Sequence, residues 1–344
     1  MAGRHHGEYT IGWICALSVE MAAAITMLDE KHPDLPTSQG DHNSYVLGRV
    51  RSHNVVIACL PSGIYGTASA ATVAATMRLT FPSIQVGLMV GIGGGVPSRQ
   101  SDVRLGDVVV GRPTRDSGGV IQHDFEKTPC PDYRRQHQLQ QNGISQILSG
   151  LAAKYPEVGI NLEHPGENQD RFFVSNYDHP EAEDTCNCCD STKLIARPRQ
   201  NSKDPRIWYG LIASANQVMK HGVARNRLAK QYGFLCYEME AAGLVNHFPC
   251  VVIRGICDYA DPHKNKQWQS YDTMTTTAYM KELLGTMSSR CTFRDCTPQT
   301  IITRRVVNTT KWFIDHPDLR AWLLERSVSS LWCTGKVRLP ASSW

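Results

Sequence analysis

The 344-residue chain lacks long apolar stretches, and no run approaches the ~18 consecutive apolar residues that a membrane-spanning helix needs. The apolar run in its first residues, MAGRHHGEYTIGWICAL, is too short for a secretory signal and predicts a first strand instead. We therefore expect no membrane partner. Twelve cysteines without such a signal indicate a reducing compartment with free thiols, so we expect a cytoplasmic protein.

The body of the chain also lacks a net charge. Residues 1–285 carry 27 Lys and Arg against 28 Asp and Glu, whereas residues 286–344 carry nine against four. The overall charge of +4 therefore belongs to the tail, and the neutral body argues against a nucleic-acid partner. With 41% apolar and 20% charged residues, the composition is that of a globular protein with a sizeable core.

Several catalytic signatures are missing. The glycine loops at residues 62–66 and 91–95 are not followed by Lys-Ser/Thr, so neither is a Walker loop, and neither fits the dinucleotide fingerprint well. No nucleophile elbow supports a Ser-His-Asp or Cys-His hydrolase. Glycines at these loops would let backbone N–H groups approach an anion or a sugar, but a tight structural turn explains each loop equally well. We expect no cofactor.

What the sequence does contain is an alternation of buried strands and amphipathic helices, which predicts an α/β fold with a mostly parallel or mixed sheet covered on both faces. Composition changes near Gly285, so we expect a domain over residues 9–285 and a poorly ordered tail over 286–344. The predicted strands are 10–17, 45–50, 54–60, 85–91, 107–110, 209–213, 234–237 and 250–256. The predicted helices are 18–32, 66–79, 133–155, 214 or 216 to 232, a short one ending at 244, and 268–284.

Carboxylates follow two of these strands, within residues 233–261. Glu238 and Glu240 end the first strand and Asp258 ends the second, at the sheet edge where open α/β folds bind ligands. Glu240 can accept two hydroxyl hydrogen bonds, as the cis-diol of a ribose would offer. Arg254 and Asp258 are four residues apart on one strand and should share a face, either lining a common cleft or forming a buried ion pair.

Two further candidates lie elsewhere in the chain. Glu20 follows the first strand at the start of a helix, where a carboxylate also complements the helix dipole. Cys186, Cys188 and Cys189, with His179 seven residues before the first of them, could ligate a metal. A zinc site generally needs a fourth ligand and a better-formed second pair, so we favour a loop of free thiols and no metal.

Taken together, these segments resemble the nucleoside phosphorylase/nucleosidase superfamily, which includes purine and uridine phosphorylases and methylthioadenosine/adenosylhomocysteine nucleosidases. The closest likeness is to a fungal branch found at the front of NOD-like receptor proteins. The resemblance covers about residues 9–285 and implies a three-layer, mixed-sheet fold. The motifs that carry it are IGWICALSVEMAAA, GIYGTASAA, GLMVGIGGGVP, LGDVVV, YGLIASANQVMK, CYEMEAAGLVNHFP and VIRGICDYADPHKNKQWQ.

The resemblance also implies roles. Asp258 falls where the family places the general acid for purine N7, and Glu20 where nucleosidases keep the carboxylate that activates water. Arg254 matches the arginine that orients this carboxylate and the nucleophile. The remaining matches are Glu240 and Met239 for the ribose; Val218, Met219 and Asn216 for the base; and Gly63, Gly66, Gly91, Gly93 and Gly94 for the loops on the nucleophile or phosphate side. Glu238 is left with a structural role.

The same resemblance favours hydrolysis over phosphorolysis. Purine phosphorylases bind phosphate with arginines, one of them in the loop that matches GIGGG, and they usually lack the Glu20 carboxylate. Residues 89–93 contain neither Arg nor Ser, and a carboxylate beside the nucleophile would repel phosphate. We predict a purine nucleosidase. The alternatives are a phosphate-dependent purine nucleoside phosphorylase and a signalling domain that binds a nucleoside without turnover.

The expected substrate is an adenine nucleoside or nucleotide, and the likeness to immune-type receptor proteins extends this to ATP and to an effector role. Relatives are dimers or trimers of dimers, so we also expect a homo-oligomer. Two departures from the branch pattern, Ala215 and Glu126, add bulk or charge near the pocket. The residues that could contact ligand phosphates are Arg197, Arg199, Lys220 and Lys127.

The tail carries a resemblance of its own. KWFIDHPDLRAWLLERSVSSLWCTGK is similar to the lead-in to a NACHT nucleotide-binding domain. The sequence then reads GKVRLP at residues 335–340, without the lysine and hydroxyl that hold phosphate and magnesium. We expect either a truncated receptor or a gene model cut at that point, in both cases without an ATPase module.

Overall fold

The computed structural model describes residues 4–112, 118–124, 142–154, 163–180, 185–200, 202–245, 250–264 and 266–287. All of these belong to one compact unit, residues 1–301. The NACHT-like segment, Glu126 and Lys127 lie outside the described residues.

Ten strands of the described residues form one mixed sheet in the order β10-β6-β8-β9-β5-β1-β4-β3-β2, with β7 paired to β8. Strand β5 pairs with β10 as well as with β9, so β10, β6, β8, β9 and β5 close into a ring. The strands are β1 Ile11–Cys15, β2 Glu30–Lys31, β3 Tyr45–Val50, β4 His53–Cys59, β5 Val86–Gly95, β6 Val108–Gly111, β7 Val120–Gln122, β8 Ile207–Ser214, β9 Phe234–Glu238 and β10 Cys250–Asp258.

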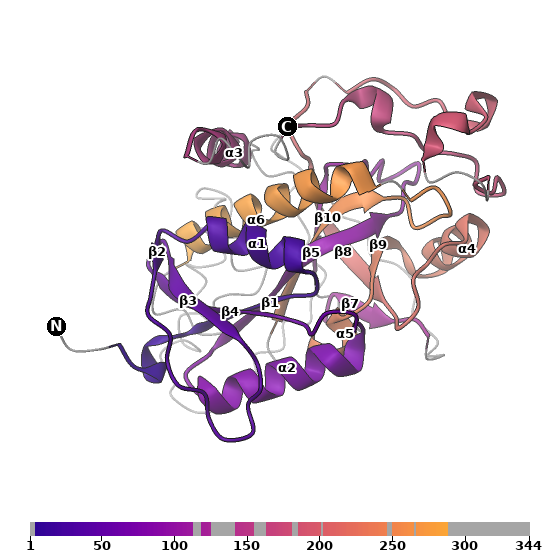
Figure 1. The fold of residues 1–344 in the computed structure, drawn as a ribbon. Coiled ribbons are helices and arrows are strands. Elements are labelled where there is room, and N and C mark those ends of the chain that lie inside the picture. The colour runs from indigo at the N-terminus through magenta and orange to yellow at the C-terminus, as the bar shows by residue number, and fades with distance from the viewer. Residues whose placement is uncertain are drawn as a thin grey trace, which may run out of the picture. The chain divides into compact units, whose positions relative to one another are not determined.

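Helices cover both faces of this sheet. Figure 1 shows α1 and α6 on one side of the strands and α2 and α5 on the other, and each pair is in contact. The predicted three-layer α/β fold with a mixed sheet is therefore confirmed. The helices are α1 Ser18–Thr26, α2 Thr67–Thr80, α3 Asn142–Lys154, α4 Gly222–Tyr232, α5 Ala241–Val245 and α6 Gln269–Thr286, and the 3-10 turns are His6–Glu8, Glu167–Gln169, Cys186–Cys188, Ser191–Lys193 and Lys266–Trp268.

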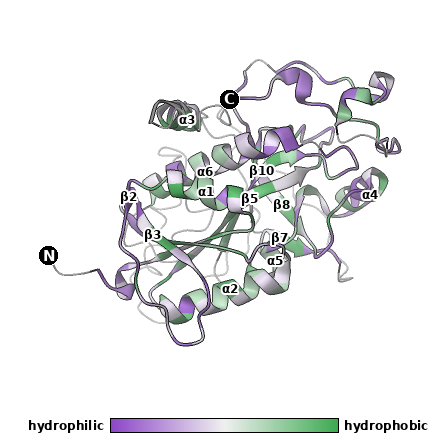
Figure 2. Ribbon diagram, viewed as in Figure 1, coloured by the Kyte–Doolittle hydropathy of each residue, from purple (hydrophilic) through white to green (hydrophobic). Residues whose placement is uncertain are grey.

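The core consists of two main apolar clusters, one on each face of the sheet. Trp13 and Ile14 are neighbours on β1, and both are fully buried. Trp13 belongs to a cluster with Met280 of α6, whereas Ile14 belongs to one with Met77 of α2. Successive side chains of a strand point to opposite faces, so a strand covered on both faces is apolar throughout. Strands β8 and β10 are accordingly mainly hydrophobic (Figure 2).

Two predicted helix boundaries are wrong. Helix α1 ends at Thr26 instead of residue 32, because Glu30 and Lys31 form β2 against β3. Helix α4 begins at Gly222 instead of residue 214 or 216. There, the Nδ1 atom of His221 accepts a hydrogen bond of 3.1 Å from the N–H of Ala224 and caps the helix.

The predicted loop at residues 91–95 is also wrong, because these residues continue strand β5. Gly91 pairs with Arg254 of β10, and Gly94 and Gly95 pair with β9. Glycine-rich sequence is untypical of a strand, but here the absence of Cβ atoms leaves room for side chains from other elements.

Among the described residues, no helix has the length and apolar character needed to cross a membrane.

Candidate active site

Glu20 lies in the first turn of α1 and is 1% exposed. Its Oε2 atom accepts hydrogen bonds from the backbone N–H groups of Ala16 and Leu17, at 2.7 and 3.0 Å, and Oε1 accepts one from Ile92 of β5 at 2.8 Å. Burial raises the pKa of Glu20, although Arg254 and these N–H groups act in the opposite direction. Glu20 therefore caps α1 and also faces β5.

Arg254 of β10 gathers the other carboxylates, and it is 1% exposed. Its Nη2 atom donates a hydrogen bond to Glu238 and lies 3.5 Å from Oε2 of Glu240, while Nη1 donates to the carbonyl oxygen of Ile92 at 3.4 Å. Glu238 also accepts hydrogen bonds from the N–H groups of Glu240 and Ala241, at 3.1 and 2.9 Å. Glu238 thus fixes both Arg254 and the start of α5, in agreement with the structural role expected for it.

The glycines of β5 allow this cluster to form. A Cβ atom at Gly91 would lie 2.2 Å from Oε1 of Glu20 and 2.8 Å from Nη1 of Arg254. A Cβ atom at Gly93 would lie 2.8 Å from the carbonyl oxygen of Tyr237 and 3.4 Å from Cβ of Arg254. Any larger residue at Gly91 would separate the carboxylate from the guanidinium, so this position requires glycine.

Three carboxylates therefore surround one guanidinium in a buried site. Burial raises the pKa of Glu240 to about 7, with Glu238 and Glu20 adding to the effect and Arg254 opposing it. Met239, which is half-buried, donates its backbone N–H to Glu240 Oε2 at 3.3 Å. With a pKa of about 7, the Glu240 carboxyl group can accept hydrogen bonds from hydroxyl groups when it is ionised, and it can also donate one when it is protonated.

The raised pKa of Glu240 predicts how stability depends on pH. The unfolded chain releases this proton near the ordinary value of 4.5 and the folded chain near 7, so the proton favours folding at low pH. This contribution is lost as the pH rises through that window. We expect the melting temperature of Glu240→Gln, relative to that of wild type, to be higher at about pH 8 than at about pH 5. The reason is that wild type loses this contribution as the pH rises, whereas Gln does not titrate. The exposed control Glu163→Gln should show no such difference, and equal changes for Glu240→Gln at both pH values would contradict the expectation.

Asp258 ends β10, and its side chain is 10% exposed. Its Oδ1 atom accepts a hydrogen bond from the N–H of Ala260 at 2.8 Å, and Oδ2 accepts one from Nζ of Lys264 at 2.9 Å. A Cβ atom at Gly94 of β5 would lie 2.6 Å from Oδ1 of Asp258. Asp258 is therefore fixed between the end of β5 and the loop that follows β10.

The simple alternation argument for Arg254 and Asp258 is wrong. The β10–β5 ladder shifts register between Ile256 and Asp258, so counting two residues per repeat does not apply across this bulge. Arg254 pairs with Glu238 and Glu240, and Asp258 pairs with Lys264, so the two form no direct ion pair. Both side chains nevertheless lie beside β5, Arg254 next to Gly91 and Asp258 next to Gly94.

The residues expected around the base lie between β8 and α4. Asn216 accepts hydrogen bonds from the N–H and hydroxyl groups of Thr67, both at 3.0 Å, and so ties this segment to the start of α2. Gly66 precedes Thr67 with φ of +103° and would clash with Asn216 if it carried a Cβ atom. Val218 is 46% exposed, whereas Met219 packs against an apolar cluster. Gly63 lies in the exposed turn before α2.

The three described residues expected to contact phosphates have different surroundings. Arg197 donates hydrogen bonds of 2.7 Å to Asp170 and to the hydroxyl of Tyr259. Arg199 pairs with Glu167 at 3.1 Å and is largely exposed, and Lys220 is exposed just before α4. Arg197 is therefore already held by Asp170 and Tyr259, whereas Arg199 and Lys220 are exposed.

The comparisons with known proteins agree with this architecture. The family described as the phosphorylase superfamily matches residues 10–285. The chain belongs to this superfamily. Within it, a protein of Hyaloscypha variabilis named as nucleotide-binding leucine-rich repeat (NLR)-like is 42% identical over 316 residues, which cover 88% of this chain and 31% of that protein. The chain thus spans less than a third of that relative's length.

Two further similar proteins are more distant, but the match covers most of their length. A 5′-methylthioadenosine/S-adenosylhomocysteine nucleosidase of Mycobacterium bovis is 25% identical over 256 residues, covering 73% of this chain and 86% of that protein. The solved structure of futalosine hydrolase from Helicobacter pylori has a TM-score of 0.50 at 16% identity and covers 82% of this chain and 100% of the other. This structural likeness supports the nucleoside phosphorylase-like fold.

Lys264 and the backbone of Ile92 are the participants that the sequence did not identify. Lys264 lies six residues after Asp258 in a loop rich in basic residues, and only the fold shows that its ammonium group reaches the carboxylate. Ile92 contributes its N–H to Glu20 and its carbonyl oxygen to Arg254. Backbone contributions of this kind leave no side-chain signal in a sequence.

Proposed function

We propose that this member of the superfamily is a purine nucleosidase that hydrolyses the N-glycosidic bond of an adenine nucleoside or nucleotide. The observation that carries the proposal is the arrangement on β5. Glu20 and Arg254 lie against Gly91, and Asp258 lies against Gly94. Gly91 and Gly94 are three residues apart, roughly 10 Å along one strand, so all three side chains lie along the same short stretch of β5.

The groups divide the reaction between them. In its protonated form, Asp258 donates a proton to N7 of the purine as the bond from C1′ to N9 breaks, so the base leaves as a neutral molecule and the resulting carboxylate is held by Lys264. Glu20 accepts a proton from water, whose oxygen forms the new bond to C1′. Glu240 holds the ribose hydroxyl groups, and Met239 packs below the sugar. Arg254 orients Glu20 and Glu240, and Lys264 positions the carboxyl group of Asp258.

The charge of the cluster supports water as the nucleophile. Glu20, Glu238 and Glu240 surround Arg254, which is the one cation of this cluster among the residues that the structure describes. The cluster therefore carries an excess of negative charge whenever its carboxylates are ionised, and a phosphate dianion would be repelled. The name of the Mycobacterium bovis nucleosidase supports the same reaction class.

A base-release assay tests the proposal. Purified protein is incubated with adenosine, methylthioadenosine, inosine or ATP, with and without inorganic phosphate, and free base and sugar products are separated by chromatography. We expect adenine release at the same rate with and without phosphate, with a free sugar as the second product. Strict dependence on phosphate, with a sugar 1-phosphate as product, would instead establish a phosphorylase.

The same assay with ATP as substrate also bears on the proposal that the chain acts as an effector in an immune-type receptor. The described Arg199 and Lys220 are exposed and could contact a triphosphate, and the NLR-like relative is consistent with an effector domain of a larger receptor. We expect Lys220→Ala to raise KM for ATP but not for adenosine. Nucleoside-dependent thermal stabilisation without any base release would point to a non-catalytic sensor.

A further inference from the structure

The segment that contains Cys186 packs against the loop after Asp258. The ring of His263 stacks on Phe173 and Tyr177, with centroid distances of 4.2 and 5.1 Å. The Sγ atom of Cys186 lies 3.8 Å from the carbonyl oxygen of His263. These contacts join the 3-10 turn Cys186–Cys188 to the residues that directly precede Lys264.

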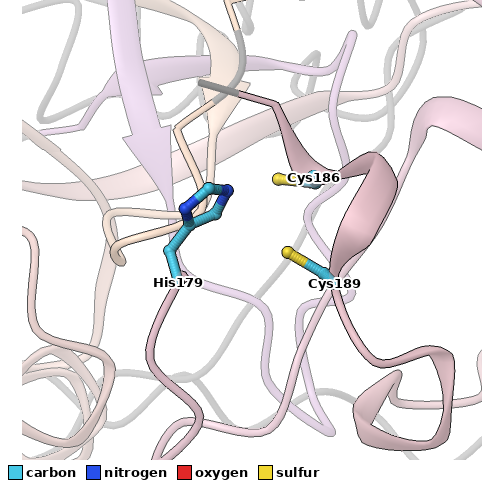
Figure 3. Close-up of side chains that lie close together, drawn as sticks. All are labelled: His179, Cys186 and Cys189. Carbon is cyan, nitrogen blue, oxygen red and sulfur yellow. The ribbon is translucent and has the colours of Figure 1, made fainter. Parts of the chain in front are cut away.

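Three donor side chains meet at this junction. One ligand atom from each of His179, Cys186 and Cys189 lies within 4.8 Å of the others. Figure 3 shows the imidazole ring and both sulfur atoms directed toward a common centre. Donor atoms of a tetrahedral zinc site are separated by roughly 3.5–4 Å, given metal–ligand bonds of about 2.0–2.3 Å. The cluster therefore needs only a small contraction to enclose an ion.

The spacing and the hydrogen bonds of the donors fit the same ion. Cys186 and Cys189 are separated by two residues, as in many zinc sites. The Nδ1 atom of His179 lies 3.0 Å from the carbonyl oxygen of Pro180. If Nδ1–H donates to this oxygen, Nε2 keeps its lone pair for a metal, which is the arrangement that orients most histidine ligands.

The surroundings of His263 support a metal site independently of the three donors. His263 is 8% exposed, and neither of its ring nitrogens has a hydrogen-bond partner among the residues described. Its ring contacts that of His179 edge-on at a centroid distance of 5.5 Å, and its Nδ1 lies 3.6 Å from Oδ1 of Asp261. A buried imidazole without partners is costly unless something binds it. His263 lies beside the three donors that are within 4.8 Å of one another and is not one of them, so its ring would have to shift for Nε2 to become the fourth ligand.

We propose that Cys186, Cys189, His179 and His263 bind one zinc ion, which fastens the segment around Cys186 to the loop that carries Lys264. Both cysteines bind as thiolates, so two thiol protons leave for solvent when the ion enters. Two thiolates and two neutral imidazoles form a closed structural site without an open coordination position for substrate. The expectation of a free-thiol loop without metal is replaced by this proposal.

Metal analysis of the purified 344-residue chain tests the site directly. We expect about one zinc per chain by mass spectrometry after dialysis against metal-free buffer. Cys186→Ser and Cys189→Ser should lose most of this zinc, and the matched control Cys188→Ser, an exposed thiol in the same turn, should retain it. His263→Phe keeps an aromatic ring for stacking but removes the ligand nitrogen, so it should release zinc to a chromophoric chelator much faster than wild type.

Cobalt substitution of the wild-type protein avoids any doubt about the folding of variants. Exchange of zinc for Co²⁺ should give thiolate-to-cobalt charge-transfer absorption together with the intense visible bands of a tetrahedral ion. Wild-type protein that neither retains zinc nor binds added zinc or cobalt would overturn the proposal, as would a Cys186–Cys189 disulfide in freshly purified, metal-free protein. Loss of zinc from Cys188→Ser, or full retention in His263→Phe, would overturn the ligand assignment. None of these measurements depends on base release.

Discussion

Replacement of Asp258 by Asn is expected to lower the rate of purine base release by roughly 10²–10⁴-fold, the usual contribution of a general acid. The asparagine amide has nearly the same shape but cannot transfer a proton to N7, so the base would have to leave as an anion. KM should change little, because Glu240 and the rest of the ribose site are untouched. The measurement is steady-state kinetics with adenosine and, in parallel, ATP.

The surroundings of Asp258 indicate which controls are needed. The carboxylate accepts from the N–H of Ala260 and from Lys264, and the single amide oxygen of an asparagine in its place can satisfy only part of this pair. Asp34 is exposed and far from Asp258 in the sequence, so Asp34→Asn provides the matched control and should keep full activity. If Asp258→Asn folds normally, as judged by its melting temperature, and releases base at the wild-type rate, then Asp258 is not the acid.

The layers of the fold could be predicted from the sequence because most of the sheet consists of strands buried on both faces. Such strands, including residues 54–60 and 250–256, are mostly apolar and are bounded by turn residues. The closure of β10, β6, β8, β9 and β5 into a ring could not be predicted, because it depends on pairing between strands far apart in the chain. The glycine run at residues 91–95 was misassigned for the same reason. Its strand conformation is imposed by neighbours on both sides.

The candidate site was predicted unevenly. Position at the ends of strands was enough to single out Glu20, Glu240 and Asp258, and the resemblance supplied the roles that still await testing. The alternation rule failed between Arg254 and Asp258 because a bulge in a ladder has no clear signature in a single sequence. That the donor atoms of His179, Cys186 and Cys189 lie close together is a tertiary feature, which the spacing of these residues in the sequence could not establish.

Glu20→Gln is expected to lower kcat for hydrolysis by a similar factor, roughly 10²–10⁴-fold, because the amide cannot accept a proton from water. This variant should also be less stable. Both oxygens of Glu20 accept backbone hydrogen bonds, from Ala16 and Leu17 on one side and from Ile92 on the other. The NH₂ group of a glutamine would face one of these N–H donors and leave it unsatisfied in the interior, at a cost of about 1–3 kcal/mol in the free energy of unfolding.

The loss of stability must be separated from the loss of chemistry, because Glu20 also caps α1. A thermal-shift titration with a slowly hydrolysed nucleoside analogue reports whether the folded variant still binds, since Glu240 and Met239 remain in place. We expect binding within a few-fold of wild type, with kcat lowered by roughly 10²–10⁴-fold. The pH profile of the wild-type enzyme gives the complementary evidence: the raised pKa of Glu20 predicts that kcat/KM falls on the acid side at a pH above the ordinary value of 4.5. Glu20→Gln that binds the analogue and still turns over adenosine at the wild-type rate would assign Glu20 to the helix cap alone.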